Sequence, residues 1–139
     1  MLRISLALSA AFLAAGARGV SFTVEGPPDE PKAWERTAAA DLQSYLAQRI
    51  GSNRLSVGGE TGIVFHVGDT AFARDKGLAS ADLADEERVI RSFGRDVVLN
   101  GGGTRGCLYA VYDFLDTSCG VRWWSDTEID VPDAGDLAL

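Results

Sequence analysis

Three glycines between an apolar run and a helix-like segment have the spacing of a phosphate-binding turn. Gly101, Gly103 and Gly106 form the pattern G-x-G-x-x-G directly after the apolar residues 97–99. In a dinucleotide site, the N–H groups at the start of the following helix bind the pyrophosphate. Asp126, twenty residues beyond Gly106, stands about where such a site places the acidic residue that binds the ribose. The first candidate chemistry is therefore nucleotide binding.

Three features of the surrounding sequence argue against a nucleotide. The strand before the glycines belongs to a predicted short hairpin, formed by residues 88–93 and 96–100. Only thirteen residues follow Asp126, which leaves no second nucleotide-binding half, and the export predicted below removes the chain from nicotinamide and flavin pools. We therefore expect no cofactor and no nucleotide. A sharp strand-to-helix turn, with positive φ angles and close backbone approach, accounts for the glycines instead.

Two groups of carboxylates could serve glycoside hydrolysis or calcium binding. Glycosidases place two carboxylates about 5–5.5 Å or about 6.5–9.5 Å apart around a sugar. Asp113 and Asp116 are three residues apart on the polar flank of a predicted helix, which favours a solvated face. Asp126, Glu128 and Asp130 alternate in an acidic segment without the glycine and closing glutamate of a calcium loop. We expect no catalytic residue in this chain.

The single histidine and the two cysteines are too few and too distant for a zinc site. His66 is the only histidine, and in an alternating strand it points away from Phe65 and Val67. Cys107 and Cys119 bracket a helix-like segment, which separates them by roughly 18 Å, whereas a disulfide allows roughly 4.4–6.8 Å between Cα atoms. We expect packed thiols and no metal. A G-x-S-x-G elbow for serine catalysis is also missing from the sequence.

The first 19 residues have the composition of a secretory signal peptide. Arg3 supplies the positive charge, residues 4–15 form the apolar run, and small residues allow cleavage after Ala17 or after Gly19. The run is shorter than the roughly 20 apolar residues that a membrane anchor requires. We therefore predict a secreted or periplasmic protein that leaves the membrane after cleavage.

The remaining chain is acidic and long enough for one domain with one core. Of 13 basic and 20 acidic residues, removal of Arg3 and Arg18 leaves 11 basic and 20 acidic, a formal charge of 11 − 20 = −9. Nucleic-acid binding depends on basic patches that neutralise phosphates, so we expect no nucleic-acid partner. The predicted domain spans residues 20–132, and residues 133–139 begin a linker.

Apolar periodicity and turn residues predict alternating strands and helices. Strands are expected at 20–25, 62–68, 88–93, 96–100 and 121–124, helices at 31–50 and 104–117, and a short helical turn at 69–76 capped by Asp69. This order predicts an α+β fold, a two-layer α/β sandwich. It consists of a mixed β-sheet with the two main helices packed on one face.

The C-terminal stretch GGGTRGCLYAVYDFLDTSCGVRWWSDTEIDVP carries a resemblance to a known family. The recurring pattern is a glycine, Arg-Gly, a Tyr, an amphipathic helix, Gly-Val, an aromatic pair and a Pro. Its members here are Gly102, Arg105, Gly106, Tyr109, the helix to Leu115, Gly120, Val121, Trp123, Trp124 and Pro132. The stretch resembles the end of the non-catalytic α/β domain that precedes the catalytic barrel in α-glucuronidases of families 67 and 115 and in family 20 β-hexosaminidases. The resemblance extends over nearly all of residues 20–132.

The resemblance implies an accessory domain rather than an enzyme. In such glycoside hydrolases the catalytic carboxylates belong to a following (β/α)₈ barrel, which needs about 250 residues. Because nothing follows Leu139, we expect a fragment of a longer secreted carbohydrate-degrading enzyme, with the barrel of the same parent chain as its partner. A stand-alone carbohydrate-binding or interaction module is the alternative.

Four residues of the resembling stretch are candidates for sugar or interdomain contact. Arg105 could pair with the carboxylate of a uronic acid. Tyr109, Trp123 and Trp124 could stack on sugar rings of a polysaccharide or oligosaccharide. Alternatively, the aromatic side chains fill the core or an interface with the barrel, which is the commoner role of large aromatics.

Overall fold

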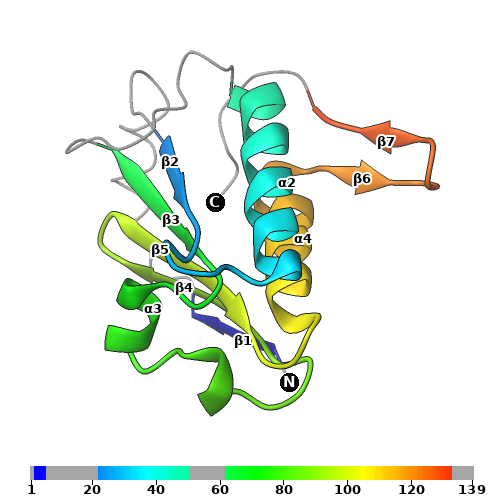
Figure 1. Ribbon diagram of the computed structural model, residues 1–139. Helices are drawn as coiled ribbons and strands as arrows, with labels where there is room; N and C mark the ends of the chain where they lie inside the picture. The colour runs from blue at the N-terminus through cyan, green and yellow to red at the C-terminus, as the bar shows by residue number, and fades with distance from the viewer. Residues whose placement is uncertain (1, 6–21, 51–61, 133–139) are drawn as a thin grey trace.

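Two helices lie side by side on one face of a mixed β-sheet, as Figure 1 shows. The computed structural model describes residues 2–5, 22–50 and 62–132. The helices are α2 (Ala33–Ile50) and α4 (Gly106–Cys119), and the short helix α3 (Ala71–Asp75) lies on the opposite face of the sheet. The predicted α+β class, with a mixed sheet and the two main helices on one face, is confirmed.

The main sheet has five strands in the order β1-β4-β5-β3-β2. Their bounds are β1 Leu2–Ser5, β2 Phe22–Glu25, β3 Ile63–Val67, β4 Arg88–Phe93 and β5 Asp96–Gly101. β2, β3 and β5 are parallel neighbours, whereas β4 pairs antiparallel with β5, which confirms the predicted hairpin. The carboxyl ends of β2, β3 and β5 therefore meet at one edge, where α2, α3 and α4 begin after their loops.

β1 lies within the range predicted as a signal peptide and pairs parallel with β4. Most of that range, residues 6–19, lies outside the described residues, as do the predicted linker 133–139 and residues 51–61 between the first predicted helix and the strand that follows it. The signal peptide stays a prediction. Its removal would leave β4 as the sheet edge, where Arg88 and Arg91 supply the charged side chains that discourage edge-to-edge pairing.

The main core lies between the sheet and the two helices. The apolar stripe of α2 buries Ala38, Leu42 and Leu46 completely. Phe65 lies beneath them in β3, and its ring contacts the edge of Phe114 from α4, with centroids 5.2 Å apart. A smaller cluster on the other face joins α3 to β4 and β5. The sheet therefore has apolar contacts on both faces, with the larger core under α2 and α4.

The boundaries of two helices, α3 and α4, differ from the predictions. α3 is capped by Thr70, whose Oγ1 accepts a hydrogen bond from Ala73 N at 3.1 Å. Asp69, the predicted cap, accepts instead from Ser80 N at 2.9 Å. α4 begins at Gly106, two residues later than predicted, and ends before Gly120, whose left-handed φ of 72° terminates the helix.

The strand predicted at 121–124 is not part of the main sheet. β6 (Arg122–Trp123) pairs antiparallel with β7 (Ile129–Asp130), a strand that the sequence did not predict. Together they form a two-stranded hairpin that projects beyond the helices (Figure 1). This hairpin carries the aromatic pair of the resembling stretch.

Candidate functional site

The glycine-rich turn is shaped by contacts between main-chain atoms. A β-carbon on Gly101 would overlap the main chain of Gly106, and one on Gly102 would overlap the carbonyl of Ala84. Gly103 has a φ of 62°, which side-chain-bearing residues rarely adopt. The interpretation of the glycines as a requirement for backbone shape is confirmed.

An acidic segment packs directly against this turn. Gly102 N donates a hydrogen bond to the carbonyl of Glu87 at 2.8 Å. The carboxylate of Asp85 lies so close to Gly103 that a β-carbon there would overlap it. A phosphate at the start of α4 would meet this carboxylate, so the surroundings of the turn oppose an anionic ligand.

Arg105 and Tyr109 lie at the first turn of α4. Arg105 is exposed and immediately precedes the helix. Tyr109 is half-buried, and the guanidinium of Arg88 lies 5.8 Å from the centre of its ring. Arg88 Nε also lies 2.5 Å from Oδ2 of Asp113. Tyr109 is therefore engaged in a contact within the domain, whereas Arg105 faces solvent.

Trp123 connects the hairpin to both main helices. Its ring makes edge-to-face contacts with Tyr45 of α2 and Tyr112 of α4, with centroids 5.7 Å and 5.5 Å apart. Its indole Nε1 donates to the hydroxyl of Tyr45 at 3.4 Å. Such aromatic pairs each contribute about 0.5–1.5 kcal/mol beyond burial. Trp123 is therefore a packing residue.

Trp124 points away from the domain. It is 69% exposed, and Ile129 on the facing strand is 42% exposed. These are the two large apolar side chains that the described part of the chain leaves exposed. α4, fourteen residues long, separates Trp124 from Arg105 by about 20 Å of helix. The four predicted contact residues therefore do not form one site.

The two carboxylates of α4 are each paired with an arginine. Asp113 contacts Arg88, as described above, and Asp116 contacts Arg122. Each carboxylate thus balances a neighbouring positive charge within the domain. This arrangement does not resemble a pair of carboxylates directed at a sugar from two sides.

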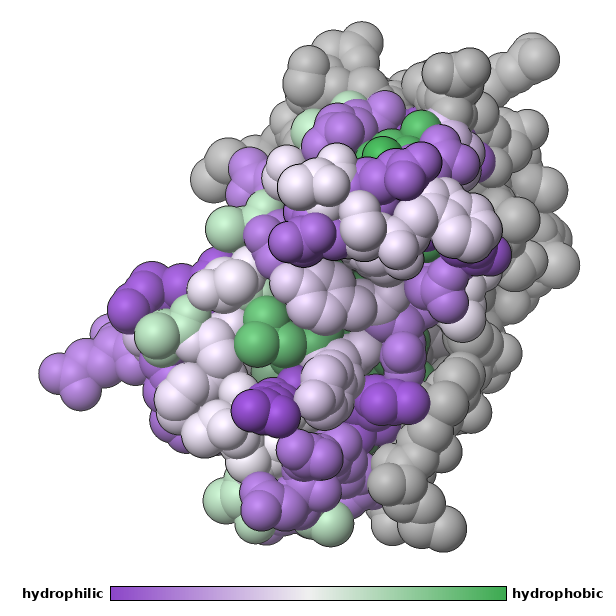
Figure 2. Space-filling view, turned by 90° about the vertical axis from the view of Figure 1, so that its right-hand side faces the viewer, coloured by the Kyte–Doolittle hydropathy of each residue, from purple (hydrophilic) through white to green (hydrophobic). Residues whose placement is uncertain are grey.

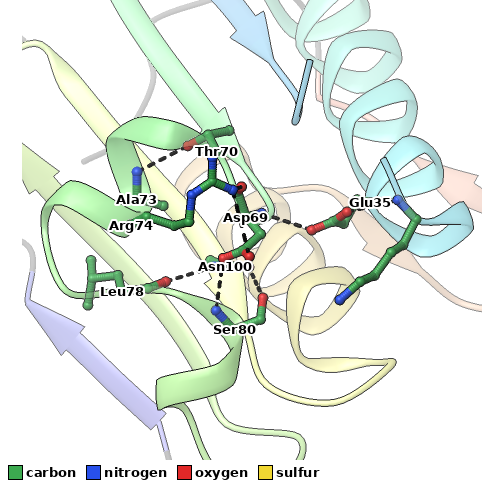
Figure 3. Close-up of polar contacts among 9 residues, drawn as sticks. Glu35, Asp69, Thr70, Ala73, Arg74, Leu78, Ser80 and Asn100 are labelled. Carbon is green, nitrogen blue, oxygen red and sulfur yellow. Dashed lines mark hydrogen bonds and ion pairs between the residues drawn. The ribbon is translucent and has the colours of Figure 1, made fainter. Parts of the chain in front are cut away.

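A polar network at the carboxyl edge of the sheet was not predicted. Figure 3 shows Glu35 pointing from α2 toward the loop after β3. Its carboxylate, in a residue that is 2% exposed, accepts hydrogen bonds from Asp69 N and Lys32 N, both at 2.9 Å. Glu35 therefore joins the start of α2 to the loop between β3 and α3.

Asn100 continues this network from β5. Its side-chain nitrogen donates to the carbonyl of Leu78 at 2.8 Å, and its Oδ1 accepts from Ser80 Oγ at 3.1 Å (Figure 3). Asn100 is fully buried. Each of these bonds stays within the network, so Glu35 and Asn100 hold loops in place rather than present groups to a ligand.

Glu35→Ala should lower the free energy of unfolding by about 3 kcal/mol, because two partly buried N–H groups would lose their charged acceptor. Urea unfolding followed by circular dichroism measures the change. Asp29→Ala, an exposed acidic residue in the loop before α2, is the control and should change stability by less than about 0.5 kcal/mol. Equal stability of the two variants would contradict the assigned role of Glu35.

His66 is packed rather than exposed. It is 6% exposed, and its ring stacks flat on Phe72 of α3 at 4.3 Å between centroids. Its Nε2 lies 2.8 Å from Oδ1 of Asp96. Glu25, at the end of β2, faces the other ring nitrogen at 3.6 Å. Sequence alternation indicated only that His66 faces away from Phe65, and its carboxylate neighbours come from two other strands.

The described residues contain neither a metal cluster nor a membrane-spanning helix. Within residues 2–5, 22–50 and 62–132, no three His, Cys, Asp or Glu side chains gather as a metal site would require. In the same ranges, no helix combines the length and apolar character needed to cross a bilayer.

No protein-family model matches the chain, and no curated protein matches its sequence.

Proposed function

We propose that this chain is the N-terminal accessory domain of a secreted carbohydrate-degrading glycoside hydrolase of α-glucuronidase-like type. It would support a (β/α)₈ catalytic barrel of the same parent chain and have no catalytic residues of its own. The observation that carries the proposal is Trp124, which is 69% exposed on a hairpin shortly before the predicted linker at 133–139. An exposed large aromatic in this position suits contact with a following domain.

The other residues of the resembling stretch have structural roles within this domain. Gly102 and Gly106 allow the tight turn before α4, and Gly120 ends that helix. Trp123 holds the hairpin against α2 and α4. Packing inside the domain therefore accounts for these members of the pattern. Trp124 is different, because its side chain is mostly exposed, and contact with a second domain would give it a role.

The surface around the hairpin suits a contact of limited area. Figure 2 views the side from which β6 and β7 project, and its apolar surface forms small green areas separated by hydrophilic residues. Interfaces between domains of one chain are typically about 600–1,500 Å² and more polar than permanent subunit interfaces. A contact centred on Trp124 and Ile129, with polar surroundings, fits this class.

Trp124→Ala should destabilise a longer protein that includes the following domain while leaving the isolated chain nearly unchanged. The chain would be expressed alone and together with the coding sequence that follows it. In the longer protein, the substitution should lower Tm by about 2–4 °C, since about 1 kcal/mol of contact is lost. In the isolated chain the change should stay below about 0.5 kcal/mol, because the side chain is exposed. Glu128→Ala on the same hairpin is the control.

Activity measurements test whether the catalytic residues belong to the following domain and not to this chain. The chain alone should not hydrolyse aryl glycosides or glucuronoxylan oligosaccharides, whereas the longer protein should. Turnover by the chain alone that is lost in Asp113→Asn would contradict the proposal. A stop codon directly after Leu139 would also contradict it and would favour a stand-alone binding module.

A further inference from the structure

A cavity opens on the face of the sheet opposite α2 and α4. Its volume is about 490 Å³, within the range of about 300–1,000 Å³ typical of small-molecule sites. Glu25 and His66 line it from the ends of β2 and β3, and Thr70 and Phe72 line it from the start of α3. Ligands of open α/β sheets commonly bind beside the carboxyl ends of parallel strands. The cavity is therefore in a favourable place for a ligand.

The imidazole of His66 is fixed in this cavity. Its Nε2 lies 2.8 Å from Oδ1 of Asp96, where an N–H donates to the carboxylate. Its ring lies nearly parallel to that of Phe72, with an angle of 8° between the planes. These two contacts hold both the position and the orientation of the ring. The second ring nitrogen, Nδ1, is consequently held on the side of Glu25.

The carboxylate of Glu25 and the ring nitrogen Nδ1 of His66 face each other at this point. Oε2 of Glu25 lies 3.6 Å from His66 Nδ1, which is longer than a hydrogen bond. The two groups are therefore close together without a direct hydrogen bond. A hydroxyl group can both donate and accept, so a ligand with two neighbouring hydroxyls can bond to Oε2 and to Nδ1 at once.

We propose that this cavity binds a small neutral polyhydroxylated molecule through two adjacent hydroxyl groups, one donating to Glu25 and one hydrogen-bonded to His66 Nδ1. The hydroxyl of Thr70, which accepts from Ala73 N through its oxygen, can donate to a further ligand oxygen. Pro28 and Phe72 supply apolar surface for the carbon atoms of the ligand. This site is on the other face of the sheet from α2 and α4, and it does not depend on the proposed function.

The single histidine provides a specific probe of this site. Because His66 is the only histidine of the chain, its imidazole NMR signals need no separation from others. D-glucose and D-xylose would be titrated to about 10 mM, a range suited to weak binding. Methylammonium chloride, which donates hydrogen bonds but carries no hydroxyl pair, would be titrated in parallel. We expect saturable shifts of the His66 signals with at least one sugar and none with methylammonium.

A matched pair of variants tests the contact with Glu25. Glu25→Gln should weaken sugar binding at least about tenfold, since a hydrogen bond to a charged acceptor is lost. Glu30→Gln makes the same change in charge at an exposed residue outside the cavity and should bind normally. Thermal unfolding of both variants is the check that each of them folds.

Three results would overturn the inference. The first is the lack of a saturable His66 shift with either sugar. The second is equal sugar affinity of Glu25→Gln and the unaltered protein. The third is a shift with methylammonium alone, which would assign the cavity to an ammonium ion rather than a hydroxylated ligand. None of these results bears on Trp124 or on the activity of the longer protein.

Discussion

Gly101→Ala should prevent the chain from folding. The added β-carbon would lie inside the van der Waals radii of the Cα and carbonyl carbon of Gly106. β5 is a central strand and α4 a core helix, so neither main chain can move without opening the core. Overpacking of a core typically costs about 1–3 kcal/mol where side chains can adjust, and a clash between main chains costs more. We expect the variant in the insoluble fraction, without native circular dichroism.

The control for this variant is Gly26→Ala. A β-carbon on Gly26 meets only Cβ of Ala39, at an ordinary 3.9 Å. We expect soluble protein with a stability within about 0.5 kcal/mol of the unaltered chain. A Gly101→Ala protein with native Tm would show that the turn is not under the steric constraint described. If that protein also bound a nucleotide less well than the unaltered chain, the glycines would have to be interpreted as a phosphate-binding turn.

The sequence predicts most of the fold because strong periodic patterns specify its elements. The stripe of α2 buries Ala38, Leu42 and Leu46 as its spacing indicates. The hairpin β4–β5 follows from two apolar runs around Gly94. The register of β3 beside β5 has no comparable local signal, because parallel strands are joined through distant segments. The arrangement of the carboxyl edge could therefore not be predicted.

The candidate site is less predictable than the fold, because its residues come together only through tertiary contacts. Glu25, His66 and Asp96 belong to three strands, and nothing in their sequence spacing places them together. Trp123 and Trp124 are adjacent and chemically identical, yet one is packed and the other is 69% exposed. The position of the hairpin beside α2 and α4 decides which of the two rings meets the helices.

Local competition between side chains explains the misplaced cap of α3. Asp69 and Thr70 are both good N-cap residues, and the sequence alone favoured the first. Asp69 instead binds the main chain of Ser80, and Glu35 accepts from its N–H. Thr70 is left to cap the helix. A contact eleven residues away thus decides the start of the helix.

The chain should lose stability in alkaline solution through its two buried thiols. Burial raises the pKa of Cys107 to about 12, with a further increase from the negative charges of Glu35 and Asp69. Burial also raises the pKa of Cys119 to about 12, although nearby Arg49 acts in the opposite direction. The unfolded value is 9.0 for both. The folded state therefore keeps the protonated thiols longer than the unfolded state does as pH rises.

The sign and range of the effect follow from proton linkage. Stability is fully present below the unfolded pKa near 9 and falls as pH rises toward the folded pKa near 12. Each thiol removes up to about 1.4 kcal/mol per pH unit within this range. Urea unfolding at intervals from about pH 8 to about pH 11 should show a constant free energy of unfolding up to about pH 9 and a steep decrease above it.

Removal of the thiols separates this effect from other alkaline titrations. Tyr112 also has a pKa raised to about 12, through burial and its hydrogen bond to Asp41, and its greater exposure makes its contribution smaller. The double variant Cys107→Ala, Cys119→Ala should therefore keep a shallow decrease, while Tyr112→Phe should retain the steep one. A flat stability profile in the unaltered protein would show that the thiols ionise equally in both states.

Since buried thiols are protected, the native protein should also react slowly with a thiol reagent at neutral pH. Rapid reaction would contradict the burial of Cys107 and Cys119.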